Sequence, residues 1–349
     1  MASATTPVRV AVADDSGFMR ILISDYLRQD PEIVLVGTAN DGKDITSLTL
    51  DQQPDVVITD LMMPGYDGLY AVRTIMKMRP TPIVLLSSLD KSDTQVFEAL
   101  SAGAAEFIGK PKGQPAANGT YAQRLIGLVK SLGRMPRLAA PSVTYDAAPR
   151  TPVVKNTAYQ HDIVVVGAST GGPAVLENLV KQLPGNLQVP IVIAQHMPPT
   201  FIETFAERLN RLSALRIKVA ESNEPLHAGT VYLAGGYHNL WLAPGEGKAV
   251  ATACYTDQQY AEFNNPSVDC LFASAAQLFG PRVMAVLLTG MGKDGAEGMA
   301  KVHQMRGTTL AQDEATCVVF GMAKAAIERG VVAKIVGAKE LPHKMLKML

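Results

Sequence analysis

The sequence predicts an α/β protein with two domains, each a doubly wound parallel sheet covered by helices on both faces. Short apolar runs alternate with stretches of helical period over residues 7–130, and the alternation resumes at Asp162. Between these regions, residues 134–160 hold four prolines and no apolar periodicity, which is typical of a linker. A chain of 349 residues also suits two or three domains at roughly 100–200 residues each.

The first domain is expected to span residues 1–133 and to be a (βα)5 unit. Its helical periodicity is clearest in Phe18–Arg28 and Leu69–Met78. Its five predicted strands are Val8–Ala13, Ile33–Val36, Val56–Thr59, Ile83–Leu86 and Glu106–Ile108.

The second domain is expected to span residues 161–349. Helices are predicted at Gly172–Leu183 and Thr200–Asn210. The predicted strands are Asp162–Val166, Ile191–Ala194, Val231–Leu233 and Arg282–Thr289.

Composition excludes several functional classes. The 32 Lys and Arg residues balance 32 Asp and Glu residues, which argues against nucleic-acid binding over the whole surface. A content of 47% hydrophobic residues excludes a disordered chain. No apolar run approaches the ~18–20 residues of a membrane helix, and the first ten residues do not resemble a signal peptide. Three cysteines without metal-ligand spacing favour the reducing cytoplasm.

Polar residues follow several predicted strands of the first domain. Asp14 and Asp15 end the first strand, Asp60 ends the third, and Lys110 follows the fifth. The carboxyl ends of parallel strands meet at one edge, so these side chains should converge. Carboxylates in such a cluster favour Mg²⁺, and Asp60 becomes a candidate nucleophile for a phosphoryl group. Ser87, at the end of the fourth strand, offers a hydroxyl that could sense that group.

Over residues 7–130 this pattern resembles the receiver domain of two-component response regulators. The resemblance is carried by the acidic pair, DLMMPGYDG around Asp60, Ser87 and the pair Lys110–Pro111. It implies that a histidine kinase phosphorylates Asp60, with Ser87 and Lys110 as switch residues. It also implies Mg²⁺ held by Asp14, Asp15, Asp60 and the Met62 carbonyl.

The second domain opens with DIVVVGASTGG, a strand that runs into glycines and a helix. A dinucleotide fingerprint would need different glycine spacing and a later acidic residue, where His196 stands instead. A phosphate-binding loop would need Gly-Lys-Ser/Thr after the glycines. Gly167–Gly171 does match G-x-S-x-G, which predicts Ser169 as an exposed nucleophile at a strand-to-helix turn.

A serine nucleophile needs a base and a group that orients the base. His196 ends the next strand, and Asp294 lies in a glycine-rich loop after another strand. Among the other histidines, His238 is the serious rival because it follows a glycine pair. The chain order Ser, His, Asp differs from that of α/β hydrolases, so that fold is excluded.

Residues 160–345 resemble the catalytic domain of the chemotaxis protein-glutamate methylesterases. The motifs are GASTGG, AQHMP, NPSVD, LLTGMGKDGAEGM and AQDEATCVVFGMAKAAI. The resemblance implies Ser169 as nucleophile, His196 as base and Asp294 as orienting carboxylate. It also implies that the backbone N–H groups of Thr170 and Met291 are the oxyanion donors. Two positions depart from the family pattern, Asn265 before Pro-Ser-Val-Asp and Ala323 after Phe-Gly-Met.

Taken together, the resemblance implies a cytoplasmic hydrolase activated by phosphorylation and recruited to chemoreceptor arrays. Its partners would be the methyl-accepting chemoreceptors and the chemotaxis histidine kinase. It would cleave glutamate γ-methyl esters, releasing methanol, without a cofactor in the catalytic domain, and some family members also deamidate glutamine. Two other classes are a transcriptional regulator, for which no helix-turn-helix is evident, and a catalytically dead phosphate sink.

Overall fold

The computed structural model describes residues 6–88, 94–111, 119–135, 160–260 and 266–349. It divides into two compact units, Met1–Thr144 and Tyr145–Leu349. Most of the predicted linker, residues 134–160, lies outside the described residues, so the linker and its boundaries stay a prediction.

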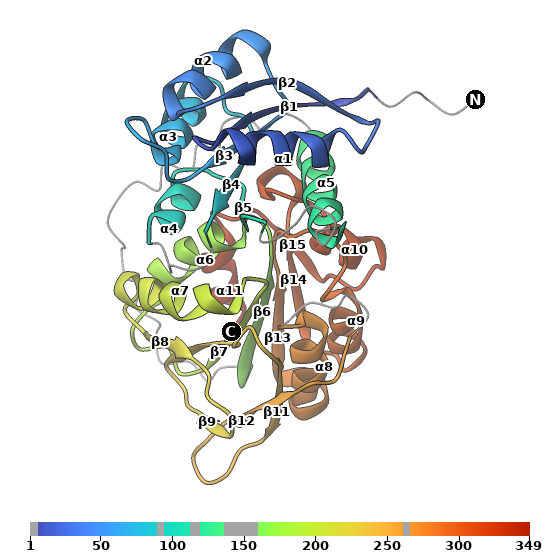
Figure 1. Cartoon of the computed structure of the whole chain (residues 1–349). Helices are drawn as coiled ribbons and strands as arrows, with labels where there is room; N and C mark the ends of the chain where they lie inside the picture. The colour runs from blue at the N-terminus through green and yellow to red at the C-terminus, as the bar shows by residue number, and fades with distance from the viewer. Residues whose placement is uncertain (1–5, 89–93, 112–118, 136–159, 261–265) are drawn as a thin grey trace, which may run out of the picture. The chain divides into compact units, whose positions relative to one another are not determined.

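The first unit contains a five-stranded parallel sheet in the order β2-β1-β3-β4-β5 (Figure 1). The predicted fold class is confirmed here, and each predicted strand is present, with β2 extending three residues further than expected. The strands are β1 (Val8–Ala13), β2 (Ile33–Ala39), β3 (Val56–Asp60), β4 (Ile83–Ser87) and β5 (Glu106–Gly109). The helices are α1 (Gly17–Leu27), α2 (Gly42–Gln52), α3 (Gly68–Met78), α4 (Thr94–Ser101) and α5 (Gly119–Gly133).

Local sequence explains where the first unit changes from strand to helix. Strands β3 and β4 are buried along their whole length, as expected for central parallel strands covered on both faces. Ser16 caps α1 by accepting a hydrogen bond from the Met19 N–H, and Asp67 caps α3 in the same way from the Tyr70 N–H. These caps start each helix close behind a strand end, where the acidic residues lie.

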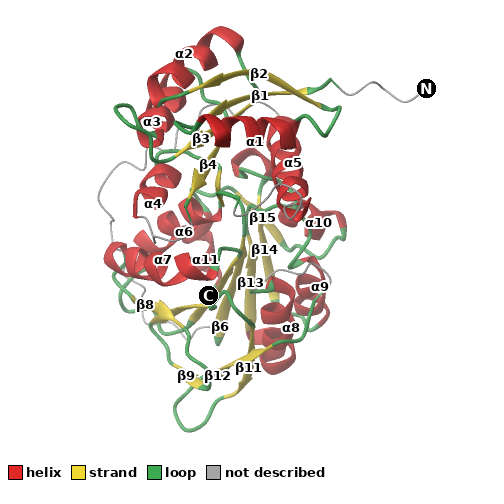
Figure 2. Cartoon of the chain, viewed as in Figure 1, coloured by secondary structure: helices red, strands yellow, loops and turns green. Residues whose placement is uncertain are grey.

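The second unit contains a seven-stranded parallel sheet in the order β15-β14-β13-β6-β7-β10-β8. Helices α6 and α7 cover one side, and α8 and α9 cover the other (Figure 2). The strands of this sheet are β6 (Ile163–Ala168), β7 (Ile191–Gln195), β8 (Arg216–Val219), β10 (Thr230–Leu233), β13 (Val283–Leu287), β14 (Thr308–Gln312) and β15 (Lys334–Val336). The α-helices are α6 (Gly172–Lys181), α7 (Pro199–Leu212), α8 (Val268–Phe279), α9 (Ala296–Gln304), α10 (Met322–Glu328) and α11 (Leu341–Met348).

The second unit also contains a small antiparallel sheet that was not predicted from the sequence. Its strands, in the order β11-β12-β9, are β9 (Glu224–Leu226), β11 (Asn239–Pro244) and β12 (Ala251–Thr256). Strand β9 has only three residues, and neither β11 nor β12 alternates regularly between buried and exposed positions, so their pattern was weak. The sheet packs through β11 against α8 and joins the core around Phe272 and Leu240.

The order of the large sheet positions a site. Strand β6 pairs with β7 on one side and with β13 on the other. The chain therefore leaves β6 in one direction and returns later to its opposite edge, which makes β6 a topological switch point. In open α/β sheets, ligands bind beyond the strand carboxyl ends at such a point.

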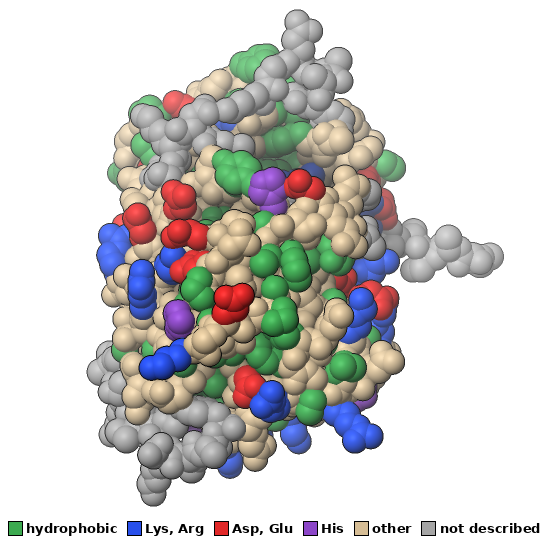
Figure 3. Space-filling model, turned by 90° about the horizontal axis from the view of Figure 1, so that it is seen from below, with side chains coloured by type: hydrophobic (Ala, Val, Ile, Leu, Met, Phe, Trp, Pro, Cys, Tyr) green, Lys and Arg blue, Asp and Glu red, His purple; other side chains and the backbone are tan. Residues whose placement is uncertain are grey.

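The surface agrees with the balanced composition. On the face shown in Figure 3, acidic and basic side chains are interspersed, and neither sign forms one large patch among the described residues. Within the same described residues, no helix is both long and apolar enough to cross a membrane.

Candidate functional sites

The first unit collects four charged side chains at one end of its sheet. Lys110 Nζ lies 2.8 Å from Asp14 Oδ2 and 2.7 Å from Asp60 Oδ2. The Lys110 N–H also donates to the Ser87 carbonyl oxygen at 2.8 Å, which ties the ends of β4 and β5 together. Oxygen atoms of Asp14, Asp15 and Asp60 all lie within 4.8 Å of one another. The predicted convergence is therefore present in the structure.

Burial and neighbouring charges shift the pKa values in this cluster. Burial raises the pKa of Asp60, although the Lys110 ammonium beside it acts in the opposite direction. Burial disfavours the ammonium as well, yet hydrogen bonds to Asp14 and Asp60 hold the pKa of Lys110 above its usual value. One ammonium thus faces three carboxylates, which leaves an excess of negative charge.

The donor set fits a hard divalent cation. Mg²⁺ prefers oxygen ligands, and three carboxylates at this separation supply them with one side open, because Asp15 is exposed. Asp14 and Asp60 are almost fully buried, so a cation there would offset charge that water reaches poorly.

The second unit places three predicted residues beyond adjacent strands. Ser169 follows β6, His196 follows β7, and Asp294 lies in the loop between β13 and α9. Gly171 has a φ of 78°, a left-handed conformation that suits glycine and turns the chain sharply from β6 into α6. His196 Nε2 lies 2.8 Å from Asp294 Oδ2.

That bond defines the chemistry of the His196 ring. An ionised carboxylate only accepts hydrogen bonds, so Nε2 carries the proton and donates a hydrogen bond to Asp294. The other nitrogen, Nδ1, then holds the lone pair and can act as a base. Among the described residues, none hydrogen-bonds to Ser169 Oγ. The serine hydroxyl is therefore available to donate to a base.

Asp294 is held at the start of helix α8. Its carboxylate accepts from the Val268 N–H at 2.8 Å, the Asp269 N–H at 2.9 Å and the Ser267 hydroxyl at 3.2 Å. The residue is only 1% exposed, and burial alone would raise its pKa. The bonds from His196 and the two backbone N–H groups outweigh burial and hold the pKa of Asp294 below its usual value.

The peptide that carries the Thr170 N–H, a predicted oxyanion donor, is fixed by hydrogen bonds to its carbonyl. The carbonyl of the same peptide, on Ser169, accepts from the Gly172 N–H at 2.7 Å and from Gln195 Nε2 at 3.0 Å. In a trans peptide the N–H points away from the carbonyl, so the two bonds aim the Thr170 N–H in the opposite direction. No described residue accepts from that N–H.

The Met291 N–H is arranged in the same way. The Gly290 carbonyl, in the same peptide, accepts from the Gly321 N–H at 3.1 Å and the Met322 N–H at 2.9 Å. Within the described parts of the chain, the Met291 N–H has no acceptor. The two predicted oxyanion donors therefore share one construction, in which two donors fix the carbonyl and leave the N–H free.

The rival histidine has a different partner. His238 Nδ1 lies 2.5 Å from Asp257 Oδ1, and both side chains are more than half exposed. His196 is the histidine that contacts the buried Asp294.

Of the two departures from the family pattern, Asn265 and Ala323, the structure describes only Ala323. Asn265 lies outside the described residues. Ala323 is the second residue of α10 and is fully buried against Ala311 and Cys317. The first turn of a helix leaves its N–H groups unpaired, so alanine or proline fits there.

Several residues that support the site were not predicted. Ser267 caps α8 by accepting from the Cys270 N–H, and its position before an apolar run was a recognisable cap signal. Thr289 donates to the Thr170 carbonyl at 2.9 Å and accepts from the Val319 N–H at 2.9 Å. Gln195 is the third such residue. Thr289 and Gln195 lie within the motifs LLTGMGKDGAEGM and AQHMP, but the sequence pattern assigns neither of them a role.

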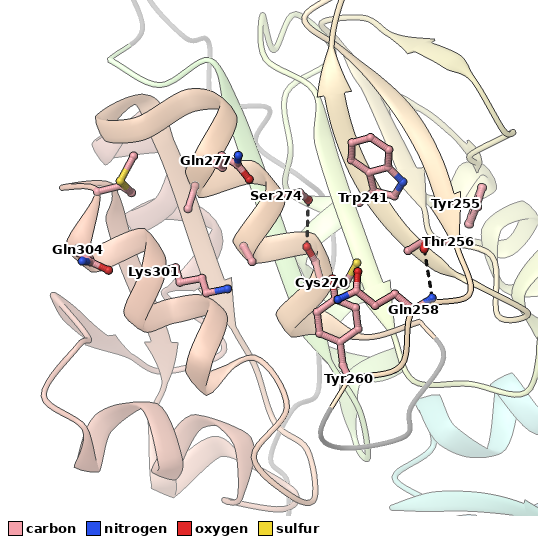
Figure 4. A pocket seen from close by; sticks show the side chains of 13 residues that line it. Trp241, Tyr255, Thr256, Gln258, Tyr260, Cys270, Ser274, Gln277, Lys301 and Gln304 are labelled. Atoms are coloured by element: carbon pink, nitrogen blue, oxygen red, sulfur yellow. Dashed lines mark hydrogen bonds between the residues drawn. The ribbon is translucent and has the colours of Figure 1, made fainter.

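A cavity of about 780 Å³ in the second unit lies apart from these residues. It runs along α8, between α9 and the strands β11 and β12, and Ser169, His196 and Asp294 do not line it (Figure 4). Its described lining includes Trp241, Thr256, Tyr260, Cys270, Ser274, Gln277, Lys301 and Gln304.

The fold and the two sites together define a class of protein. It has a receiver-type α/β unit and a second α/β unit with a serine, a histidine and an aspartate at its switch point. Comparison with known families agrees. A response regulator receiver domain model matches residues 10–117, and a CheB methylesterase model matches residues 164–345. The chain belongs to the CheB methylesterase family.

Full-length relatives support this membership. A protein-glutamate methylesterase/protein-glutamine glutaminase 2 of Carboxydothermus hydrogenoformans is 39% identical, covering 98% of this chain and 99% of the relative. A protein of Thermotoga maritima with the same name, without the number, is 36% identical over 98% of both chains. The crystal structure of the Thermotoga maritima CheB methylesterase catalytic domain is 40% identical, with a TM-score of 0.52. It covers 54% of this chain and 99% of that domain.

The buried Asp269 generates a prediction about pH. Its carboxylate accepts from the Gly298 N–H at 2.7 Å, while burial and the neighbouring Asp294 raise its pKa to about 6. The folded state therefore takes up a proton at higher pH than the unfolded state, whose value is near 3.8. The stability that the Asp269 carboxyl contributes to the folded wild type is fully present below pH 3.8 and is lost as the pH rises through about 6.

We expect Asp269→Asn, which imitates the protonated acid, to gain stability relative to wild type as pH rises through this window. Urea unfolding followed by the fluorescence of Trp241, the single tryptophan, reports on the second unit alone. Glu246→Gln, at an exposed site with no ion-pair partner among the described residues, is the matched control. Parallel stability curves for wild type and Asp269→Asn would show that Asp269 does not titrate in this range.

Proposed function

We propose that this protein is a phosphorylation-activated hydrolase that removes methyl groups from glutamate γ-methyl esters on chemoreceptors, releasing methanol. The observation that carries the proposal is the bond between His196 and the buried Asp294, beside Ser169 at the switch point. Membership of the CheB methylesterase family and the names of the full-length relatives support the substrate.

In the acylation step, Ser169 Oγ attacks the ester carbonyl carbon and His196 Nδ1 takes its proton. The carbonyl oxygen becomes an oxyanion, which the N–H groups of Thr170 and Met291 stabilise. The bond from carbon to the methoxy oxygen then breaks. The leaving oxygen takes the proton from Nδ1 and departs as methanol.

In the deacylation step, water attacks the acyl-enzyme. His196 takes a proton from that water and returns it to Ser169 Oγ, which leaves a glutamate carboxyl group on the substrate. Asp294 stays ionised throughout and stabilises the imidazolium that forms in each step. These steps use only groups of the protein. A glutamine side chain would follow the same path with ammonia as the leaving group.

The first unit supplies the control. Asp60 is the phosphoryl acceptor, and a histidine kinase of the chemotaxis system is the donor. Mg²⁺ held by Asp14, Asp15 and Asp60 would offset charge on the phosphoryl oxygens. Lys110, which contacts both buried carboxylates, and Ser87 would be the switch residues that respond when Asp60 is modified.

The remaining parts of the proposal concern organisation and setting. The receiver domain spans residues 1–133, the linker 134–160 and the methylesterase domain 161–349. The protein acts in the cytoplasm, where its chemoreceptor substrates recruit it to receptor arrays.

The first test concerns the nucleophile. Ser169→Ala should lower methanol release from methylated receptor membranes by about 10⁴-fold or more, because no other group can form the acyl-enzyme. Ser213→Ala, in the same unit at the end of α7, should keep wild-type activity. Methanol release that persists in Ser169→Ala would contradict the assignment. Wild-type protein that takes up phosphate but releases no methanol would favour the phosphate-sink alternative.

The second test concerns the switch. A small acyl phosphate with Mg²⁺ should raise methanol release by wild type and leave Asp60→Asn at its basal rate, because the amide cannot accept the phosphoryl group. Asp25→Asn, an exposed position on α1, should respond as wild type does. Equal stimulation of Asp60→Asn would show that the phosphoryl group acts elsewhere.

A further inference from the structure

The side chain of Gln195 joins the two segments that carry the proposed nucleophile and base. Gln195 is the last residue of β7 and is only 2% exposed. Its Nε2 donates to the Ser169 carbonyl at 3.0 Å and to the His196 carbonyl at 2.9 Å. One amide group thus holds the backbone on both sides of the gap between β6 and β7.

The link lies where the sheet no longer provides one. The last backbone hydrogen bond between the end of β6 and the residue after β7 runs from the His196 N–H to the Ala168 carbonyl at 2.9 Å. Beyond it, one segment turns into α6 and the other leads to α7. Among the described residues, it is the Gln195 side chain that bonds to both segments after they part.

The orientation of the amide follows from its partners. Both partners are carbonyl oxygens, so the NH₂ group must face them, because a flipped amide would put oxygen against two oxygens. This orientation leaves Gln195 Oε1 buried without a hydrogen-bond partner, which is unfavourable. The cost implies that the two bonds from Nε2 matter enough to retain it.

Gly172 makes room for this arrangement. A Cβ atom at position 172 would lie 2.2 Å from Gln195 Oε1, far inside van der Waals contact. The glycine at the start of α6 and the glutamine at the end of β7 therefore form a matched pair.

We propose that Gln195 is a positioning residue for catalysis, a role that rests on the proposed function. Its bond to the Ser169 carbonyl fixes the peptide whose N–H, on Thr170, faces the oxyanion. Its bond to the His196 carbonyl fixes the backbone that carries the base. Gln195 aligns the nucleophile, the base and one oxyanion donor without touching the substrate.

The test compares Gln195→Met and Gln195→Glu in the full-length chain. Both variants should lower kcat for a small activated ester by about 10–100-fold, because small misplacements at a reacting centre are that costly. KM should stay nearly unchanged. Gln182→Met is the control, since Gln182 Nε2 also donates to an oxygen, Asn178 Oδ1, but away from the site. It should retain wild-type kcat.

A pH profile separates positioning from general damage. Glutamate at position 195 can donate one hydrogen bond when protonated and none when ionised, whereas methionine can never donate. The kcat of Gln195→Glu divided by that of Gln195→Met should therefore rise as pH is lowered. Titration of the reactive serine with a fluorophosphonate gives the active fraction, so that kcat refers to folded sites.

Three outcomes would overturn the proposal. One is an unchanged kcat per reactive serine in both variants. Another is a loss of kcat with a Glu-to-Met ratio that does not vary with pH, which indicates a packing role only. The third is wild-type hydrolysis that persists in Ser169→Ala. That result refutes the proposed nucleophile itself, and it is recognised without either Gln195 variant.

Discussion

The anchoring of the Asp294 carboxylate at the start of helix α8 is the interaction on which the catalytic unit depends. A buried carboxylate is unfavourable unless donors surround it. Here two backbone N–H groups, the Ser267 hydroxyl and His196 supply those donors. Because the carboxylate stays ionised and fixed, it selects one tautomer and one orientation of the imidazole. Each proton transfer in the proposed chemistry depends on that tautomer and orientation.

Both units solve the same physical problem in different ways. Each gathers charged groups at the carboxyl ends of parallel strands, where helix starts and loops can surround them. In the first unit the excess charge is only partly offset by Lys110, which suits the proposed binding of a cation and a phosphoryl group. In the second unit the charge of Asp294 is fully met by fixed donors, which suits a site that must not rearrange during turnover.

The residues at strand ends could be predicted from the sequence because two local signals coincide there. An apolar run predicts the strand, and a polar residue after it predicts the edge, which identifies Asp60 and His196, whereas Ser169 was predicted from the G-x-S-x-G match. Ser267 carried a helix-cap signal that was not used. Gln195 could not be predicted, since its role depends on two carbonyls brought together by strand pairing. The sheet of β9, β11 and β12 was missed because β9 has only three residues and because β11 and β12 show no sustained alternation of buried and exposed positions.

The central claim, that Asp294 fixes His196 with its proton on Nε2 and its lone pair on Nδ1, can be measured by ¹⁵N NMR. Histidine-labelled protein, with the His196 signals identified by their loss in His196→Gln, reports which ring nitrogen carries the proton. The structure predicts a protonated Nε2 and an unprotonated Nδ1 at a pH where the ring is neutral. A proton on Nδ1, with Nε2 bare, would contradict the assigned bond to Asp294 and the direction of proton transfer derived from it.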